Sequence, residues 1–384
     1  MTARQAAQAA NRALRAVIAA AKALATAATA GGGVVIAVVV VICLCGIILA
    51  SPLGIFFAGP DETTGAISPA QAVAQINGEL GEKLSSMQAE GRYDTLELQG
   101  QPPPWSDILA VFAVKTAGTD DGVPVAVLDA ANVDALRTVF WDMTKLTSSS
   151  REVDHPSSGD APAWTERILI VTITARTPDD MRVFYSFTET QDAFLDELLA
   201  NYDLLTTLTG DLTISDATAK KLLADLPADL APERRAVVET ACKLVGKVNY
   251  FWGGKSLVIG WDSRWGQLTK VWADGSSTTG TYLPYGLDCS GFVDWVFYNV
   301  TAGEYIIGHG GGAHAQHTYC TPISWDEAQP GDLVFYPGDE HVGIVGGRDE
   351  SGNLLIIHCA FSQNSVVITN SNGFVVSAMP NYFQ

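Results

Sequence analysis

The chain has 384 residues, of which 47% are hydrophobic and 17% charged, so it is long enough for two domains and apolar enough to build packed cores. Its 42 acidic residues outnumber its 23 basic residues and give a formal net charge of −19 at pH 7. These figures exclude a wholly disordered chain, and the acidic balance argues against nucleic-acid binding.

An apolar segment near the N-terminus predicts the topology of the chain. Positions 31–60 carry no charge, and Val34–Ala50 is almost unbroken apolar sequence, close to the ~20 residues that cross a bilayer as a helix. We therefore expect a transmembrane helix over residues 32–57. A cleaved signal peptide is the main alternative, because Ala50 and Ala58 are small enough for a processing site. A buried core helix is a second, less favoured alternative.

The charge distribution around this segment predicts its orientation. Residues 1–31 contain no acid and four basic residues, which are Arg4, Arg12, Arg15 and Lys22. Positive charge beside a membrane helix stays in the cytoplasm, so the rest of the chain is expected outside the cell, as part of a single-pass protein of the cell membrane. The exported part keeps 19 cations against 42 acids, a formal charge of −23.

The six cysteines do not indicate a disulfide-stabilised domain. Cys43 and Cys45 lie inside the apolar segment, where such a pair is more typical of apolar packing or acylation than of a metal site. The other four cysteines, which are sparse for an exported chain, are Cys242, Cys289, Cys320 and Cys359. The sequence therefore leaves room for a reduced, functional thiol.

Residues 61–212 are expected to form a middle domain that is mainly helical or α+β. Ser68 as a cap, followed by apolar residues at helical spacing up to Gly91, predicts a stalk or a packing helix. The other predicted elements are helices at Asp107–Lys115, Val133–Met143 and Asp179–Leu208, a strand at Arg167–Arg176 and a polar loop at Ser148–Ala163.

The last domain is expected at residues 232–384, after a linker at residues 213–231. Pro232–Val245 predicts an amphipathic helix that opens this domain. No catalytic constellation is visible before it. Acidic pairs such as Glu189 with Asp192 have the residue types of glycosidase carboxylates, but solvated helix faces explain them better.

One cysteine of the last domain has the setting of a nucleophile. Asp288–Gly291 reads DCSG and precedes an apolar helical face, so Cys289 is expected at a helix N-terminus. Unpaired N–H groups and the helix dipole lower the pKa of a thiol there and favour the thiolate. The competing interpretation is a core cysteine that opens a buried helix.

Two downstream histidines favour the catalytic interpretation. His341 begins the alternating segment HVGIVGG, which predicts a strand with an imidazole at one end, facing a cysteine. A second predicted strand, Leu354–Cys359, carries His358, which is placed to bond the far nitrogen of His341. Nucleophile, base and orienting group are the parts needed for thiol acyl transfer. For His358, the alternative that it is an ordinary polar residue at a strand end stays open.

Five features occur in a fixed order: YFWGG at 250–254, DCSGF at 288–292, PGDLVF at 330–335, HVGIV at 341–345 and a later histidine. This order resembles the NlpC-type family of papain-like cysteine peptidases, which cut the peptide stems of bacterial peptidoglycan. The resemblance covers about residues 232–384. It implies a papain-like α+β domain with a helix packed on an antiparallel sheet, and no cofactor. It also implies Cys289 as nucleophile, His341 as base and His358 as third polar residue.

The resemblance implies further site residues around the nucleophile. Tyr250 resembles the tyrosine near the oxyanion site, although a buried aromatic before a Gly-Gly turn is an alternative. Asp288 and Ser290 resemble the residues that receive the free amine of a stem peptide, with a helix cap as the competing explanation. Trp252 is expected to contact substrate. Asp332 belongs to a turn and is expected to be structural.

The sequence departs from the family pattern in one place. An insertion of 33 residues, Lys255–Leu287, separates WGG from DCSG. Its aromatic residues, which are expected to line the substrate cleft, are Trp261, Trp265, Trp272 and Tyr282. The bond preference of shorter relatives therefore does not transfer directly.

A zinc site is the main rival interpretation of the last domain. Its candidate ligands are His309, His314, His317 and Cys320. Two-residue gaps do not keep three of these ligands on one helical face, and no acidic second shell is visible. The glycines at 310–312 predict a mobile loop and lack the context of a phosphate loop. No metal is expected.

The whole architecture is similar to that of wall hydrolases encoded on Gram-positive conjugative elements. It implies a membrane-anchored peptidoglycan hydrolase that faces the cell wall, cuts the bond between D-glutamate and the diamino acid of stem peptides, and opens the wall locally for a conjugative secretion apparatus. Expected partners are stem peptides, the membrane and, through residues 61–212, secretion-system proteins, but no nucleic acid. The alternative is a non-catalytic wall-binding or scaffold protein.

Overall fold

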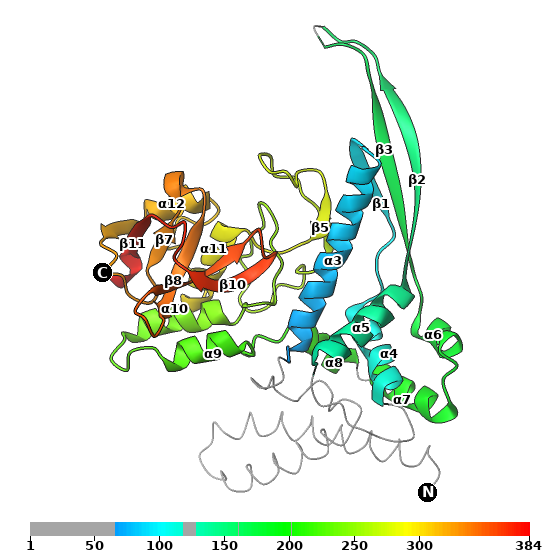
Figure 1. The fold of residues 1–384 in the computed structure, drawn as a ribbon, viewed down its shortest axis with the longest axis horizontal. Coiled ribbons are helices and arrows are strands. Elements are labelled where there is room, and N and C mark those ends of the chain that lie inside the picture. Colours follow the sequence, from blue (N-terminus) through cyan, green and yellow to red (C-terminus); the bar gives the residue numbers. More distant parts are fainter. Residues whose placement is uncertain (1–65, 118–127, 160, 201) are drawn as a thin grey trace, which may run out of the picture. The chain divides into compact units, whose positions relative to one another are not determined.

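The computed structural model describes residues 66–117, 128–159, 161–200 and 202–384 (Figure 1). The basic segment 1–31 and the predicted transmembrane helix at 32–57 lie outside these residues. Within the described part of the chain, no helix is both long and apolar enough to span a bilayer. Contacts divide the chain into two units; one includes Gly100–Lys145 and Ile173–Thr209, and the other includes Ala70–Gln99, Leu146–Thr172 and Gly210–Gln384.

The described part of the first unit is helical. Its helices are α4 (Trp105–Ala117), α5 (Ala130–Met143), α6 (Pro178–Phe184), α7 (Glu189–Leu199) and α8 (Tyr202–Thr209). The predicted helices at 107–115 and 133–143 are therefore confirmed. The single helical stretch expected at 179–208 is instead three helices, because capping boxes at Thr177 and Thr188 start α6 and α7 anew. Helix α4 is the centre of this unit and contacts α5, α7 and α8.

A three-stranded sheet has the order β1-β3-β2. Strand β1 (Thr95–Gln99) runs parallel to β3 (Trp164–Ala175), which confirms the strand predicted at 167–176. The polar loop expected at Ser148–Ala163 is wrong in its first half, because β2 spans Thr144–His155. Most side chains of β2 are exposed, so its sequence lacks the apolar alternation from which a strand is predicted. The strand forms through backbone pairing with β3.

Helix α3 (Pro69–Glu90) packs on the C-terminal part of its own unit. Its formation confirms the helix predicted from Ser68 to Gly91, with Leu80 and Leu84 on the buried face. The Asn249 side chain donates to the carbonyl of Ala74 at 2.9 Å. The sequence left open whether this helix is a stalk or a packing helix. These contacts show that it is a packing helix.

The C-terminal region is built on a six-stranded antiparallel sheet with the order β10-β9-β8-β7-β11-β6. Its strands are β6 (Cys320–Ile323), β7 (Leu333–Phe335), β8 (Val342–Arg348), β9 (Leu354–Ala360), β10 (Ser365–Asn370) and β11 (Val376–Pro380). Strands β8 and β9 confirm the two strands predicted around the histidines. The chain is thus a mixed α+β protein with a sheet-rich C-terminal domain.

Helices α10 (Pro232–Cys242) and α11 (Cys289–Val300) pack on each other and on β8 (Figure 1). Helix α10 confirms the amphipathic helix predicted from Pro232. The shorter helices of this unit are α9 (Ala217–Ala224) and α12 (Gly312–His317). Phe292 and Trp295 of α11 are fully buried, and each contributes about 2–3 kcal/mol through burial of apolar surface. This packing holds the first turn of α11 against the beginning of β8.

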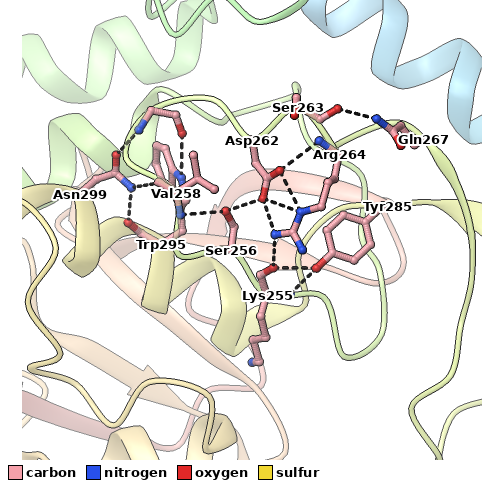
Figure 2. Close-up of polar contacts among 11 residues, drawn as sticks. Lys255, Ser256, Val258, Asp262, Ser263, Arg264, Gln267, Tyr285, Trp295 and Asn299 are labelled. Carbon is pink, nitrogen blue, oxygen red and sulfur yellow. Dashed lines mark hydrogen bonds and ion pairs between the residues drawn. The ribbon is translucent and has the colours of Figure 1, made fainter.

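The insertion at 255–287 folds into a hydrogen-bonded loop and a small hairpin of β4 (Leu268–Lys270) and β5 (Tyr282–Pro284). Figure 2 shows the loop joined to α11 through Asn299 and Trp295, whose indole N–H donates to Gly260 at 3.1 Å. Trp265 is 7% exposed and packs on Trp295, so the expectation that the aromatics line the cleft is wrong for this residue. Trp272, in contrast, is 74% exposed.

Candidate active site

Cys289 is the first residue of α11, as the sequence predicts. Asp288 is the N-cap, with extended backbone angles, and its Oδ1 accepts the backbone N–H of Gly291 at 2.6 Å. An aspartate at this position satisfies one of the free N–H groups of the first turn. Cys289 itself is only 7% exposed.

The pKa of the Cys289 thiol is raised in its surroundings, whereas its position at a helix N-terminus by itself predicts a lowered pKa. Burial, followed by the negative charge of Asp288, raises the pKa of Cys289 to about 11. The backbone amides of Val342 and Ser290 and the charge of Lys255 lower the pKa, but they offset only part of the cost of burial. Desolvation therefore outweighs the helix dipole, and the proton stays on sulfur until a base removes it.

His341 lies immediately before β8, and His358 lies in β9. Nε2 of His341 and Nδ1 of His358 are 2.7 Å apart. On the far side, Nε2 of His358 lies 2.9 Å from the hydroxyl oxygen of Thr369 in β10. The structure thus brings together the two histidines that the sequence predicts, and it adds Thr369, which sequence reasoning missed.

This chain of hydrogen bonds assigns the tautomers. The Thr369 hydroxyl donates to the carbonyl of Asn370 at 2.9 Å, so its oxygen accepts the Nε2–H of His358. Nδ1 of His358 then lacks a proton and accepts the Nε2–H of His341. Nδ1 of His341 is left unprotonated, which is the state that a general base requires.

Both imidazoles are neutral near pH 7. Burial lowers the pKa of His341 to about 4, with Asp288 acting in the opposite direction. Burial, followed by the proximity of His341, lowers the pKa of His358 to about 3. The aromatic rings of Tyr336 and Phe374 surround His341 at centroid distances of 4.9 and 5.7 Å and account for part of this desolvation.

The cysteine and the base lie at one place in the fold. The sulfur of Cys289 is close enough to the backbone N–H of Val342, the residue after His341, for that amide to lower its pKa. The charge of Asp288 shifts the pKa of both Cys289 and His341. The head of α11 and the start of β8 therefore bring together a thiol and an unprotonated imidazole, the two groups that acyl transfer by a cysteine requires.

Tyr250 also belongs to this place. It is 8% exposed, packs edge-to-face against Phe361, and forms an isolated parallel bridge with Leu287. Burial raises the pKa of its phenol, and the proximity of Cys289 and of the Asp288 carboxylate adds to this effect. The hydroxyl is thus a protonated hydrogen-bond donor close to Cys289.

The residues expected to contact substrate are already engaged with the insertion. The Trp252 indole N–H donates to the carbonyl of Asp274 at 2.9 Å. The Lys255 ammonium lies 2.8 Å from Oδ1 of Asp288 and also donates to the hydroxyl of Ser290. Sequence reasoning missed Lys255, although a cation directly after the WGG segment was the available signal.

Two of the four candidate zinc ligands are bonded to one carboxylate. Nδ1 of His314 and Nδ1 of His317 bond the two carboxylate oxygens of Asp339 at 2.9 and 2.8 Å. In the part of the chain that the structure describes, no group of three His, Cys, Asp or Glu side chains is arranged to hold a metal ion. The groups that the structure brings together at the head of α11 are a thiol, two imidazoles and a phenol.

Comparisons with known proteins locate a family match at the same residues. A profile of the NlpC/P60 family matches residues 247–379. A Listeria grayi protein described as "Probable endopeptidase p60" is 42% identical over 74 residues, which cover 18% of this chain and 14% of that protein. The chain thus aligns with only a small part of that relative's length. The crystal structure of the NlpC/p60 domain of the peptidoglycan hydrolase SagA is 27% identical, with 38% of this chain and 97% of that chain covered and a TM-score of 0.26.

Proposed function

Residues 247–379 form an NlpC/P60 domain, and from this premise we propose that the protein is a cell-wall hydrolase that acts as a cysteine endopeptidase. The observation that carries the proposal is the chain from His341 through His358 to Thr369, which leaves an unprotonated imidazole nitrogen beside the head of α11. A papain-like mechanism requires this set of groups. A purely structural role does not require them.

In the proposed reaction, Nδ1 of His341 takes the proton from the Cys289 thiol while the sulfur attacks the scissile amide carbonyl. The phenol of Tyr250 donates a hydrogen bond to the oxyanion of the tetrahedral intermediate. The intermediate collapses to a thioester, and the leaving amine receives the proton from His341. Water then gives a proton to His341 and attacks the thioester, and the released sulfur regains its proton.

The proposed substrate is a peptidoglycan stem peptide, cut between D-glutamate and the diamino acid. This assignment extends the family resemblance of the ordered motifs, and the name of the Listeria grayi relative is consistent with an endopeptidase. We place the C-terminal domain outside the cell, anchored through the apolar segment 32–57, because the basic residues 1–31 precede that segment. Local opening of the wall for a conjugative secretion apparatus, with partners at residues 61–212, is part of the same proposal.

The test uses the full-length protein with purified muropeptides and mass spectrometry of the products. Cys289→Ala is expected to reduce cleavage by on the order of 10³-fold or more, because an alanine side chain cannot form the thioester. Cys320→Ala, which removes another free thiol of the same domain, is the matched control and should retain activity. Undiminished cleavage by Cys289→Ala would refute the proposed function.

A further inference from the structure

The two residues that flank the nucleophile are bridged by a lysine from the insertion. The Lys255 ammonium lies 2.8 Å from Oδ1 of Asp288 and donates a second hydrogen bond to the hydroxyl of Ser290. That hydroxyl in turn donates to the same Oδ1 at 2.9 Å. Asp288, Ser290 and Lys255 thus form a closed triangle next to Cys289.

The backbone of Lys255 is fixed by the insertion, as Figure 2 shows. Its carbonyl accepts the Tyr285 hydroxyl at 2.7 Å and the Arg264 guanidinium at 3.2 Å. Arg264 is held in turn by the buried carboxylate of Asp262, which also accepts from Ser256 at 2.8 Å. The Lys255 side chain extends away from this network. Because its backbone is held by these hydrogen bonds, the network sets the direction in which the ammonium points.

The stem of Lys255 passes over a glycine at the head of α11. A Cβ at Gly291 would lie 2.0 Å from the carbonyl oxygen of Gly254 and 3.1 Å from Cδ of Lys255. The backbone N–H of Asp288 also donates to that Gly254 oxygen, at 3.1 Å. Only a residue without a side chain at 291 permits this approach, so the position of the ammonium is built into the fold.

The ion pair decides which charge a substrate can carry next to Asp288 and Cys289. The side chain of Asp288 is 11% exposed and that of Lys255 28% exposed, so the two charges are partly withdrawn from water. A carboxylate in such a place needs a cation, supplied either by a ligand or by the chain itself. Here the chain supplies it, and a second ammonium at the same carboxylate would meet the charge of Lys255.

We propose that Lys255 is a specificity-determining residue. Its ammonium fills, from within the chain, the position that the α-ammonium of a free stem peptide would otherwise take at Asp288 and Ser290. The enzyme therefore prefers stems whose N-terminal amine is acylated, as in stems still joined to the glycan strand, over free peptides. This inference rests on the proposed function and names the substrate class of the same site.

A second effect of Lys255 supports this role. Its positive charge lowers the pKa of Cys289, against the opposing charge of Asp288. In a site where only a substrate ammonium neutralises the Asp288 carboxylate, an acylated substrate brings no such cation. The negative charge of Asp288 would then raise the pKa of Cys289 without compensation. With Lys255 in place, the charge that opposes Asp288 at Cys289 comes from the chain itself, whether or not the substrate brings a cation.

The experiment compares two synthetic tetrapeptide stems that differ only at the N-terminus, one with a free α-amine and the other N-acetylated. We expect kcat/KM of the full-length wild-type protein to favour the acetylated stem by about tenfold or more. Lys255→Met keeps the length of the side chain and removes the charge, so it should bring the ratio close to one. Lys270→Met, in the hairpin of the same insertion, is the matched control and should leave the ratio unchanged.

The ratio of the two substrates is internal to each preparation, so a partly unfolded variant loses both activities and keeps its ratio. Equal rates in the wild type, a preference for the free amine, or an unchanged ratio in Lys255→Met would overturn the inference. The wild-type ratio decides the matter even where Lys255→Met does not fold. Failure of the proposed function looks different, because then neither stem is cleaved in a Cys289-dependent manner.

Discussion

His341 and His358 share a hydrogen bond of 2.7 Å, from Nε2 of the first to Nδ1 of the second. Because the Thr369 hydroxyl occupies the other nitrogen of His358, only one direction of this bond is compatible with all three groups. The bond holds the ring of His341 and leaves its Nδ1 free to accept a proton. The group that holds His341 is thus a buried imidazole, whose pKa is lowered to about 3.

Replacing His358 separates orientation from proton transfer. His358→Leu removes the acceptor for His341, and we expect kcat to fall by on the order of 100-fold, with a smaller change in KM. His358→Asn keeps a carbonyl oxygen as acceptor and should recover part of the loss. The measurement is steady-state kinetics with a muropeptide across pH. Equal activity of Leu and Asn variants would contradict an orienting role.

The buried histidines should make the protein sensitive to acid. The pKa values of His341 and His358 in the folded state, about 4 and about 3, lie below the unfolded value of 6.5. Between these values the unfolded state binds more protons, so the free energy of unfolding rises with pH. The contribution is fully present above about pH 6.5 and is lost as the pH falls toward 4 and below. For His341 it is on the order of 3 kcal/mol.

Urea unfolding at a series of pH values, followed by tryptophan fluorescence, measures this dependence. The comparison is with His358→Leu, which lacks one of the two groups and should show a shallower slope between about pH 3 and 6.5. A wild-type curve that is flat across this window would show that the two imidazoles are not held neutral by burial.

The raised pKa of Cys289 predicts that its thiol reacts slowly with alkylating reagents at neutral pH. The thiolate is the reactive form, so the rate of alkylation by iodoacetamide should increase about tenfold per pH unit from pH 7 to 10. An unstructured peptide with the sequence of residues 286–292 should instead level off above its ordinary pKa of about 8.5. Mass spectrometry of the tryptic peptide follows the reaction. A plateau for the protein below pH 8 would mean an ionised resting thiol.

A buried ion pair joins α10 to the turn before β7. Arg234 and Asp332 are 2.8 Å apart, with side chains 9% and 1% exposed. Removing one partner leaves the other charge buried and unpaired, so Arg234→Ala should lower the free energy of unfolding by about 3–5 kcal/mol. Arg235→Ala, at the half-buried neighbour, should change it by less than about 1 kcal/mol. Urea midpoints measure both variants, and similar midpoints would be inconsistent with a structural ion pair.

Local patterns in the sequence were sufficient to place the main groups of the site. The apolar face after Cys289 predicts α11, and the alternation after His341 predicts β8, because both depend on the spacing of neighbouring residues. The pairing of His358 with Thr369 could not be read in this way. It depends on how β9 and β10 are aligned, and that register is set by the turn between them.

By itself, the sequence determined which residues are proposed to carry the chemistry and on which helix or strand most of them lie. Only the tertiary structure decided the protonation state of Cys289 and which cation pairs with the Asp288 carboxylate. The helix dipole acts within a few residues and can be inferred from sequence, whereas desolvation depends on every surface that packs over the thiol. The contact of Lys255 with Asp288 joins residues 33 positions apart, and it exists only because Gly291 lets the insertion approach the head of α11.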